Sequence, residues 1–162
     1  MTLEILKSTN PILKKKAKAV KSVTKEIRDL IDRMEEAMRA APGIGLAAPQ
    51  VGHSVRVIVV DIGEGLMALV NPKIAGKSGR DAMVEGCLSV PRIEAPVERY
   101  ASVTVKGLNQ QGKPIEIKAE GLLARVLQHE IDHLDGILFV DRVKDKTLIR
   151  YVPPKEAGKE VL

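Results

Sequence analysis

The order of the predicted elements constrains the fold of this chain most, because strands precede one late amphipathic helix. Alternating or β-branched patterns predict strands over residues 55–61, 66–71 (ended by Pro72), 102–106 and 115–118, the last two as a hairpin. A helix is predicted over residues 120–134, with Gly136 just past its end. Strands grouped before a helix predict an α+β fold, not the alternating units of a doubly wound sheet.

Two further helices are predicted before the strands. Asn10-Pro11 suits the cap and first turn of a short helix over residues 11–18. Thr24 is the expected cap of a longer helix with one apolar face, which Pro42-Gly43 ends.

Composition narrows the class of protein. The 162 residues predict one domain that needs no disulfide, and the single cysteine, Cys87, excludes an internal one and suits a reducing compartment. Only 2% of the residues are aromatic, which argues against stacking on nucleic-acid bases, and no DNA partner is expected. No apolar run approaches the length of a membrane span, and the first residues lack a signal-peptide pattern. We therefore expect a cytoplasmic protein without a membrane partner.

The net charge of +5 is concentrated near the two ends of the sequence. Residues 1–40 carry ten basic against six acidic residues, and residues 137–162 carry six against four. The lysines at 14–16, 18 and 21 could meet a polyanion or could simply form a solvated face. The sequence leaves both interpretations open.

The strongest chemical signal is the run His129-Glu130-Ile131-Asp132-His133. Side chains at i and i+4 of a helix lie about 5–6 Å apart on one face, so two imidazoles there can bind one metal ion. The intervening glutamate can then act as a base toward a water on that ion. The alternative is two histidines packed by chance, but two of only three histidines frame this glutamate, which favours the metal site.

A hydrolytic metal site needs a third protein ligand and one open position. Phe139 stands where a metzincin has its third histidine, and Glu156 and Glu160 lie in a segment without helical periodicity. The third ligand should therefore lie upstream, where Cys87 is the soft candidate.

Cys87 itself has two other interpretations. A lone cysteine in such a chain is more often a small buried apolar residue than a ligand. It could also be a thiol nucleophile paired with His53, His129 or His133, although the last two are better explained as ligands.

A third segment, Gly-Ile-Gly-Leu-Ala-Ala-Pro-Gln at residues 43–50, follows the first long helix. It lacks the third glycine and the following helix of a dinucleotide-binding loop. It could be a tightly packed turn, or a loop whose backbone pairs with an extended peptide and which ends in a neutral donor, Gln50.

Together, the three segments resemble the peptide deformylases, hydrolases that remove the N-formyl group from nascent chains. That family carries Gly-x-Gly-Leu-Ala-Ala-x-Gln, Glu-Gly-Cys-Leu-Ser and His-Glu-x-Asp-His-Leu-x-Gly, which stand here in the same order at 43–50, 85–89 and 129–136. The resemblance implies an α+β fold with antiparallel strands wrapped around the motif-bearing helix. It also implies one catalytic domain over residues 1–143, followed by a basic tail over 144–162 that matches no long helix of the family.

The resemblance assigns roles to the motif residues. Cys87, His129 and His133 are implied to bind a divalent metal, Fe²⁺ in this family, although the ligands alone suit Zn²⁺ equally and Ni²⁺ or Co²⁺ could replace it in a purified sample. Glu130 is implied to take a proton from the attacking water and pass it to the leaving amine. The Gln50 amide and the Leu88 backbone N–H are expected to stabilise the oxyanion.

The implied substrate is a formyl-methionyl peptide. Four side chains are expected to line an apolar methionine pocket: Ile44, Leu122, Val126 and the ring of His129. The peptide backbone is expected to add as a strand beside Ile44, Gly45 and Gly86. Glu85 and Arg99 should pair as a brace behind the site, and Arg125 is expected at the pocket rim, in contact with water.

Two functions from other classes remain as alternatives. A zinc endopeptidase would cut internal peptide bonds, but the missing downstream ligand counts against it. A non-catalytic metal-binding or ribosome-binding module would need neither Glu130 nor Gln50. The basic tail is a candidate contact with the ribosome that carries the nascent chain.

Overall fold

The computed structural model describes residues 2–153 and 162. Its larger sheet contains five antiparallel strands in the order β1-β2-β3-β6-β7. These strands are β1 (Gly45–Ala47), β2 (Val57–Val60), β3 (Met67–Ser78), β6 (Ser102–Leu108) and β7 (Pro114–Glu120). The predicted hairpin is therefore present as β6 and β7.

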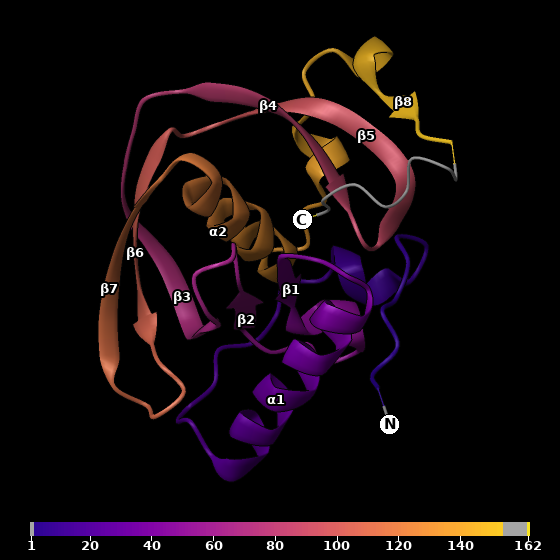
Figure 1. Ribbon diagram of the computed structural model, residues 1–162. Helices are drawn as coiled ribbons and strands as arrows, with labels where there is room; N and C mark the ends of the chain where they lie inside the picture. Colours follow the sequence, from indigo (N-terminus) through magenta and orange to yellow (C-terminus); the bar gives the residue numbers. More distant parts are fainter. Residues whose placement is uncertain (1, 154–161) are drawn as a thin grey trace.

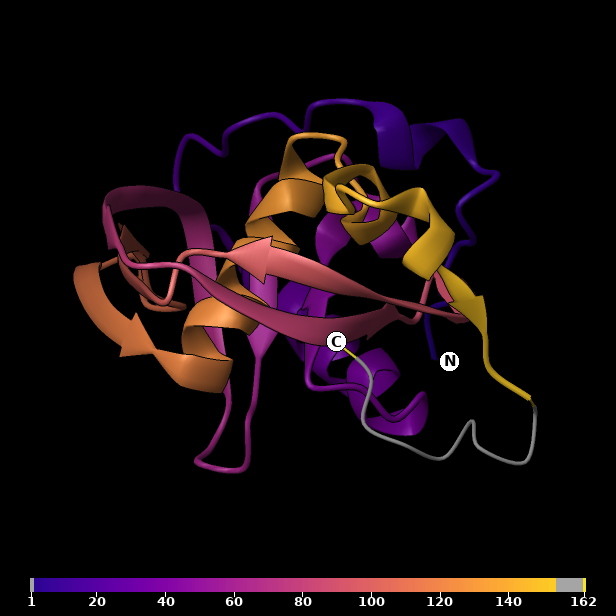
Figure 2. The same ribbon diagram turned by 90° about the horizontal axis from the view of Figure 1, so that it is seen from above.

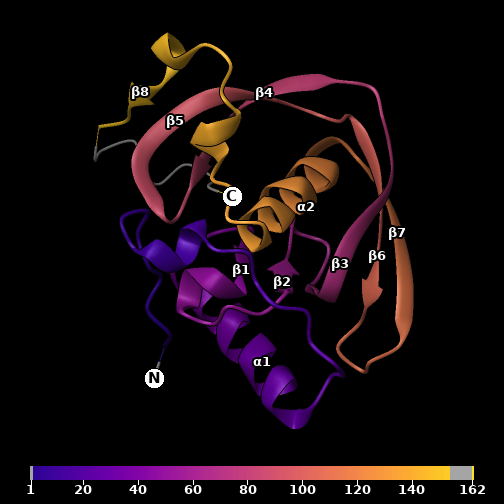
Figure 3. The same cartoon turned by 180° about the vertical axis from the view of Figure 1, so that it is seen from behind.

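A smaller antiparallel sheet in the order β4-β5-β8 consists of β4 (Asp81–Cys87), β5 (Val90–Arg99) and β8 (Arg150–Tyr151). Helix α2 (Gly121–Leu134) lies between this sheet and the larger one. Figures 1 and 3 show β4 and β5 arching over one side of α2, while β1, β2 and β3 lie on the other. Figure 2 shows the same hairpin crossing α2 from above. The α+β fold, with antiparallel strands wrapped around the motif-bearing helix, is confirmed.

Strand β2 separates two apolar clusters, because its alternate side chains point to opposite faces. Ile58 and Val60 pack in the cluster that contains the buried side of α2, including Val126 and Leu127. Val57 and Val59 pack in a second cluster with helix α1 (Lys25–Ala40). All four β2 side chains are buried, which agrees with the β-branched run predicted as a buried strand.

Helix α1 follows the predicted pattern. The Thr24 hydroxyl accepts a hydrogen bond from the Ile27 N–H at 3.3 Å, which caps the helix. Five residues at helical spacing are buried: Leu30, Ile31, Met34, Ala37 and Met38. Within residues 2–153 and 162, the structure contains no helix with the length and apolar character needed to cross a membrane.

Two predicted element boundaries are wrong. Strand β3 does not stop at Pro72 but continues to Ser78, because the pairing with β6 shifts register between Val70 and Lys73. A proline lacks the N–H that a regular ladder requires and is tolerated at such a bulge. The predicted helix over 11–18 is only a 3₁₀ turn, η1 (Pro11–Lys14), after which the Ala17 N–H donates to the Leu134 carbonyl at 2.8 Å.

The β4–β5 hairpin is the principal element that the sequence pattern did not predict. β5 contains Pro91 and Pro96, which lower its strand propensity. Its pairing with β4 is set by tertiary contacts, and its buried residues Ala95 and Val97 pack with Cys87 and Phe139. This hairpin carries the middle motif of the sequence to α2.

The described part of the predicted tail contacts the smaller sheet. η4 (Lys146–Leu148) precedes β8, in which Tyr151 pairs with Ile93 of β5. Residues 154–161 of the predicted tail lie outside the described residues.

Candidate metal centre

Helix α2 supplies two histidines and a glutamate to one buried site. His129 and His133 lie one turn apart, with ring centroids 5.2 Å apart, and both are 1% exposed. The helix ends just beyond His133, where Gly136 has a φ of 74° and any side chain there would meet the Lys14 carbonyl. The end of α2 is therefore fixed against the N-terminal segment, which holds the histidines in place.

Strand β4 brings the cysteine to these histidines. The pairing with β5 shifts between Glu85 and Cys87, so Gly86 occupies an irregular position and Cys87 is opposite Val90. The Cys87 Sγ lies 3.4 Å from the His133 Nε2. One ligand atom from each of Cys87, His129 and His133 lies within 4.8 Å of the others, so the three residues could hold a metal ion. Two imidazoles and a thiolate suit a tetrahedral ion with one open position.

The orientation of His129 also fits a metal ligand. Its Nδ1 lies 3.0 Å from the Glu85 Oε1 and donates to that carboxylate, so Nε2 is the nitrogen that can face an ion. The Nε2 is buried and has no hydrogen-bond partner among the described residues. Burial lowers the pKa of His129, but Cys87 and Glu85 outweigh burial and raise it to about 10. A cation at Nε2 would compete with that proton.

Glu85 is the centre of a buried ion network. Arg99 donates to both of its oxygens, at 2.6 Å and 2.9 Å, and Arg125 donates from Nη1. Burial raises the pKa of Glu85. The hydrogen bonds from His129 and Arg99, together with their charges, outweigh burial and lower the pKa to about 2. Glu85 is therefore an anion at neutral pH, and Glu85 and Arg99 form an ion pair directly behind His129.

The network continues to the protein surface through Asp132. Arg99 donates from Nη1 to Asp132 at 2.9 Å, and Arg142 donates to both Asp132 oxygens, at 3.0 Å and 2.8 Å. Burial lowers the pKa of Arg99, but the carboxylates outweigh it and raise the pKa above its ordinary value. Charged partners thus link the buried histidine to the half-exposed Arg142.

Glu130 differs from these carboxylates because it has no cationic partner. It is fully buried, and neither carboxylate oxygen has a hydrogen-bond partner among the described residues. Burial raises the pKa of Glu130 to about 7. Strand β1 passes so close that a Cβ on Gly45 would lie 2.5 Å from the Glu130 Oε2 and 2.9 Å from the Val126 Cγ1. Only glycine fits at position 45 without displacing this carboxylate.

Gln50 reaches the cysteine from η2 (Ala48–Val51). Its Oε1 accepts from the Ala47 N–H at 2.9 Å, and its Nε2 donates to the Ser89 hydroxyl at 3.0 Å. The Nε2 also lies 3.7 Å from the Cys87 Sγ. The amide is therefore fixed at one end, and its donor side faces the metal ligands.

The other predicted residues lie around this group to different degrees. Leu88 follows Cys87 directly, and its carbonyl accepts from the Lys7 Nζ at 3.4 Å. Ile44 and Leu122 are partly buried and pack against the apolar cluster that contains Val126. These contacts place Ile44, Leu122 and Val126 in one apolar region.

The prediction for Arg125 is wrong. It is 2% exposed, and besides Glu85 its guanidinium donates to the Val97 and Asp81 carbonyls, at 2.9 Å and 2.8 Å. Glu85, supplied by β4, attracts the guanidinium inward, away from water.

Sequence reasoning also missed the contributions of Asp132 and Ser89. Both residues stand inside the quoted motifs, but their partners come from distant segments. Asp132 binds two arginines, and the Ser89 hydroxyl accepts a hydrogen bond from Gln50.

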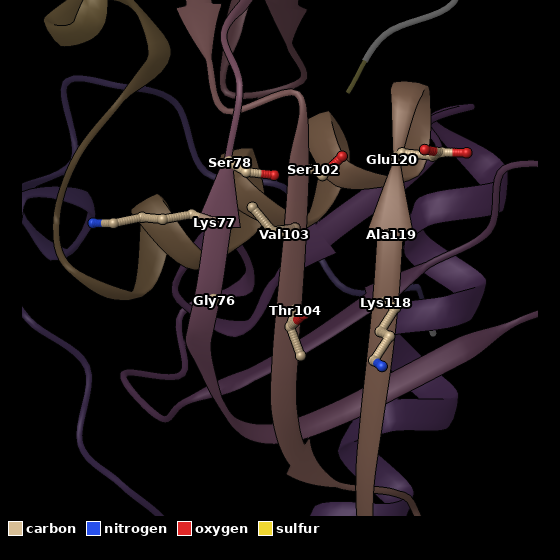
Figure 4. A pocket seen from close by; sticks show the side chains of 9 residues that line it. All are labelled: Gly76, Lys77, Ser78, Ser102, Val103, Thr104, Lys118, Ala119 and Glu120. Atoms are coloured by element: carbon tan, nitrogen blue, oxygen red, sulfur yellow. The ribbon is translucent and has the colours of Figure 1, made fainter.

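A separate hollow of about 460 Å³ lies where β3, β6 and β7 run side by side (Figure 4). None of the predicted site residues lines it. The Lys77 ammonium at its edge lies 5.0 Å from the centre of the Tyr100 ring. The lining residues are Gly76, Lys77, Ser78, Ser102, Val103, Thr104, Lys118, Ala119 and Glu120.

Comparison with known proteins identifies the family of this chain. The sequence model of the family described as polypeptide deformylase matches residues 2–148. The chain belongs to this family. Its relatives include the peptide deformylase of Halothermothrix orenii, which is 57% identical over 143 residues, or 87% of this chain and 93% of the relative. That of Pelotomaculum thermopropionicum is 52% identical over 153 residues, or 94% of this chain and 97% of the relative.

Solved structures of the family share the fold. The peptide deformylase from Synechococcus elongatus, in complex with actinonin, has a TM-score of 0.87 and 42% identity, over 90% of this chain and 80% of the other. A Met-Ala-Ser-bound class I type b peptide deformylase from Acinetobacter baumannii has a TM-score of 0.83 and 38% identity, over 88% of this chain and 99% of the other. The family is metal-dependent and removes the formyl group from the N-terminal formyl-methionine of nascent polypeptides. The chain is accordingly a hydrolase of protein biosynthesis.

Proposed function

We propose that this chain deformylates formyl-methionyl peptides with a ferrous ion held by Cys87, His129 and His133, and with Glu130 as the proton carrier. The observation that supports this most is the buried, unpartnered Glu130 carboxylate next to three converging ligand groups. A structural carboxylate at this depth would have a cation or hydrogen-bond donors around it.

The donor set supports a divalent metal. The His129 Nε2, which has no hydrogen-bond partner among the described residues, lies in one buried group with the Cys87 thiol and His133. When bound, the ion supplies Lewis-acid chemistry, which activates water and polarises the formyl carbonyl. We assign Fe²⁺ as the bound ion, as in this family. Metal analysis of the purified protein distinguishes it from Zn²⁺, Ni²⁺ and Co²⁺.

Glu130 is suited to moving a proton between the attacking water and the leaving nitrogen. Burial holds its pKa near neutrality, at about 7, where a carboxyl group can both accept and donate a proton. A nearby cation would favour the carboxylate and so prepare it to accept. The close backbone at Gly45 limits where its oxygens can lie.

The oxyanion that develops on the formyl oxygen needs donors that are fixed before the reaction. The Gln50 amide fits this role, since its oxygen is anchored by the Ala47 N–H and its nitrogen faces Cys87. We assign the second donor to the Leu88 backbone N–H, which follows the cysteine in sequence. Two fixed donors spare the reaction the cost of reorganising water.

The methionine side chain would bind among Ile44, Leu122, Val126 and the His129 ring. The first three share one apolar region, and Val126 lies one turn before Glu130 on α2. The substrate backbone would pair with Ile44, Gly45 and Gly86. The Met-Ala-Ser-bound relative supports a methionine-led peptide as the ligand of this chain.

We place the reaction in the cytoplasm, at the ribosome from which formylated chains emerge. The candidate contacts are the tail residues Lys144, Lys146 and Arg150. Lys144 pairs with Glu98, Arg150 pairs with Glu94 and Lys146 donates to the Val140 carbonyl, so nearby groups hold all three at the surface. Replacing the three with alanine should weaken cosedimentation with ribosomes at low salt and leave turnover of a short peptide unchanged.

The matched control replaces Lys15, Lys16 and Lys18, which form no ion pair with any described residue. Equal salt-dependent binding by the tail variant and the wild type would refute the tail contact, and a loss confined to the control would assign the contact to the N-terminal lysines.

The deciding test of the proposed function is formate release from a formyl-methionyl tripeptide by protein purified without oxygen. We expect about one bound metal per chain, iron in the anaerobic preparation, and one formate per peptide with the internal peptide bonds intact. Internal cleavage without formate would indicate an endopeptidase, and neither product would indicate a non-catalytic module.

A further inference from the structure

Leu162 lies among the apolar residues to which we assign the methionine pocket. It is 7% exposed and belongs to the same apolar cluster as Val126. Ile44 and Leu122 pack against that cluster. A residue far from the motifs in sequence therefore shares the apolar surroundings of the proposed substrate pocket.

The position of Leu162 in space agrees with this shared cluster. Figures 1 and 3 show the chain end marked C beside α2, between β1 and the β4–β5 hairpin, and the view from above in Figure 2 places it next to β4. Helix α2 carries His129, strand β1 carries Gly45 and strand β4 carries Cys87. Leu162 thus lies close to the three elements that carry the proposed metal ligands and the proposed substrate-pairing strand.

We propose that Leu162 is an internal ligand of the methionine pocket and must leave it before substrate binds. The inference rests on the proposed function, which assigns that pocket. Leucine and methionine are close in volume and replace each other in apolar sites with little cost, so a pocket shaped for one side chain accepts the other. The leucine side chain carries no formyl group that the enzyme could hydrolyse. Leu162 therefore blocks the pocket reversibly and is not itself cleaved.

This arrangement makes the enzyme its own competitive inhibitor. Because Leu162 belongs to the same chain, its effective concentration at the pocket is independent of protein concentration. The apparent KM rises in inverse proportion to the fraction of enzyme whose pocket is free, so occupancy of about 70–90% raises KM about three- to ten-fold. The value of kcat stays unchanged, since saturating substrate displaces the leucine.

The kinetic test compares Leu162→Asp with a matched control. Aspartate cannot enter an apolar pocket without a large desolvation cost, so L162D should lower KM about three- to ten-fold at constant kcat. Leu148→Asp makes the same chemical change at a leucine that is 51% exposed, and its KM should equal that of the wild type. Leu162→Met keeps an apolar side chain and should retain the high KM. A KM for L162D equal to that of the wild type would overturn the inference.

A direct test follows the Leu162 methyl groups by NMR in zinc-loaded protein labelled at leucine methyls. Their resonances, identified by their loss in L162M, should shift when a methionyl tripeptide is added, and the Leu148 methyls should not. Leu162 signals that stay unchanged while the tripeptide binds would overturn the inference. Formate release by the wild type together with an unchanged L162D would refute only this inference, whereas a metal-loaded wild type that releases no formate would refute the proposed function.

Discussion

Gly45→Ala tests whether the close approach of β1 positions Glu130. The added methyl carbon would lie 2.5 Å from the Glu130 Oε2 and 2.9 Å from the Val126 Cγ1, and real contacts of this kind are at least 3.0 Å. To restore a contact of 3.0 Å, the carboxylate would have to move by at least about half an ångström. It is fully buried and has little free space for this movement. The three atoms nearest to this methyl belong to Glu130 and Val126 and not to a metal ligand, so metal content should stay the same.

The size of the effect follows from the displacement. A misplacement of about 1 Å costs roughly 10²-fold in rate, and the full contribution of a general acid–base is about 10²–10⁴-fold. A shift of about half that distance should therefore lower kcat/KM about 10- to 100-fold. Overpacking should also lower the free energy of unfolding by about 1–3 kcal/mol.

The assay combines formate release, metal content and thermal unfolding on the same preparation. Gly76→Ala is the matched control, because its methyl would lie an ordinary 3.5 Å from Thr104 and its backbone is not left-handed. If metal-loaded G45A kept kcat/KM within two-fold of the wild type, the position of Glu130 would not depend on β1. If G45A instead lost its metal, Gly45 would act on the ligands and our reasoning would be wrong.

Two further variants test the ligands and their support. Cys87→Ala should lose most of the bound metal and activity, because two imidazoles alone form a weak site; one metal per chain and normal turnover would refute the ligand set. Arg99→Met leaves Glu85 and Asp132 with less cationic compensation and should destabilise the fold by about 3–5 kcal/mol in chemical denaturation. Arg80→Met removes the exposed pair with Glu98 and the stacking of the guanidinium on Tyr100, and it should destabilise the fold far less than Arg99→Met. Equal losses in the two variants would contradict a special role of the buried network.

Local patterns predicted the parts of the site that depend on neighbours in sequence. The i, i+4 spacing of His129 and His133 requires only a helix, and the sequence from Leu122 to Leu134 has the apolar periodicity of one. The hairpin of β6 and β7 likewise depends on a turn-rich segment between two alternating runs. The third ligand, by contrast, came from elimination and from the family resemblance.

The remaining features depend on contacts between distant segments. Arg125 was expected in water because a charged helix residue usually lies there, but Glu85 of β4 draws it inward from 40 positions away. Strand β5 contains two prolines and forms because β4 and β8 pair with it. Strand β3 passes Pro72 because β6 accommodates a bulge. In each case a tertiary partner decided what propensity alone could not.

The measurement that tests the central claim most directly is the metal content and turnover of Glu130→Gln. Glutamine keeps the shape of the side chain but cannot accept a proton, and the three ligands are unchanged. We predict about one metal per chain, unchanged peptide affinity and a kcat/KM lower by roughly 10²–10⁴-fold. Near-normal formate release by metal-loaded E130Q would show that another group carries the proton, and it would contradict the account of this site.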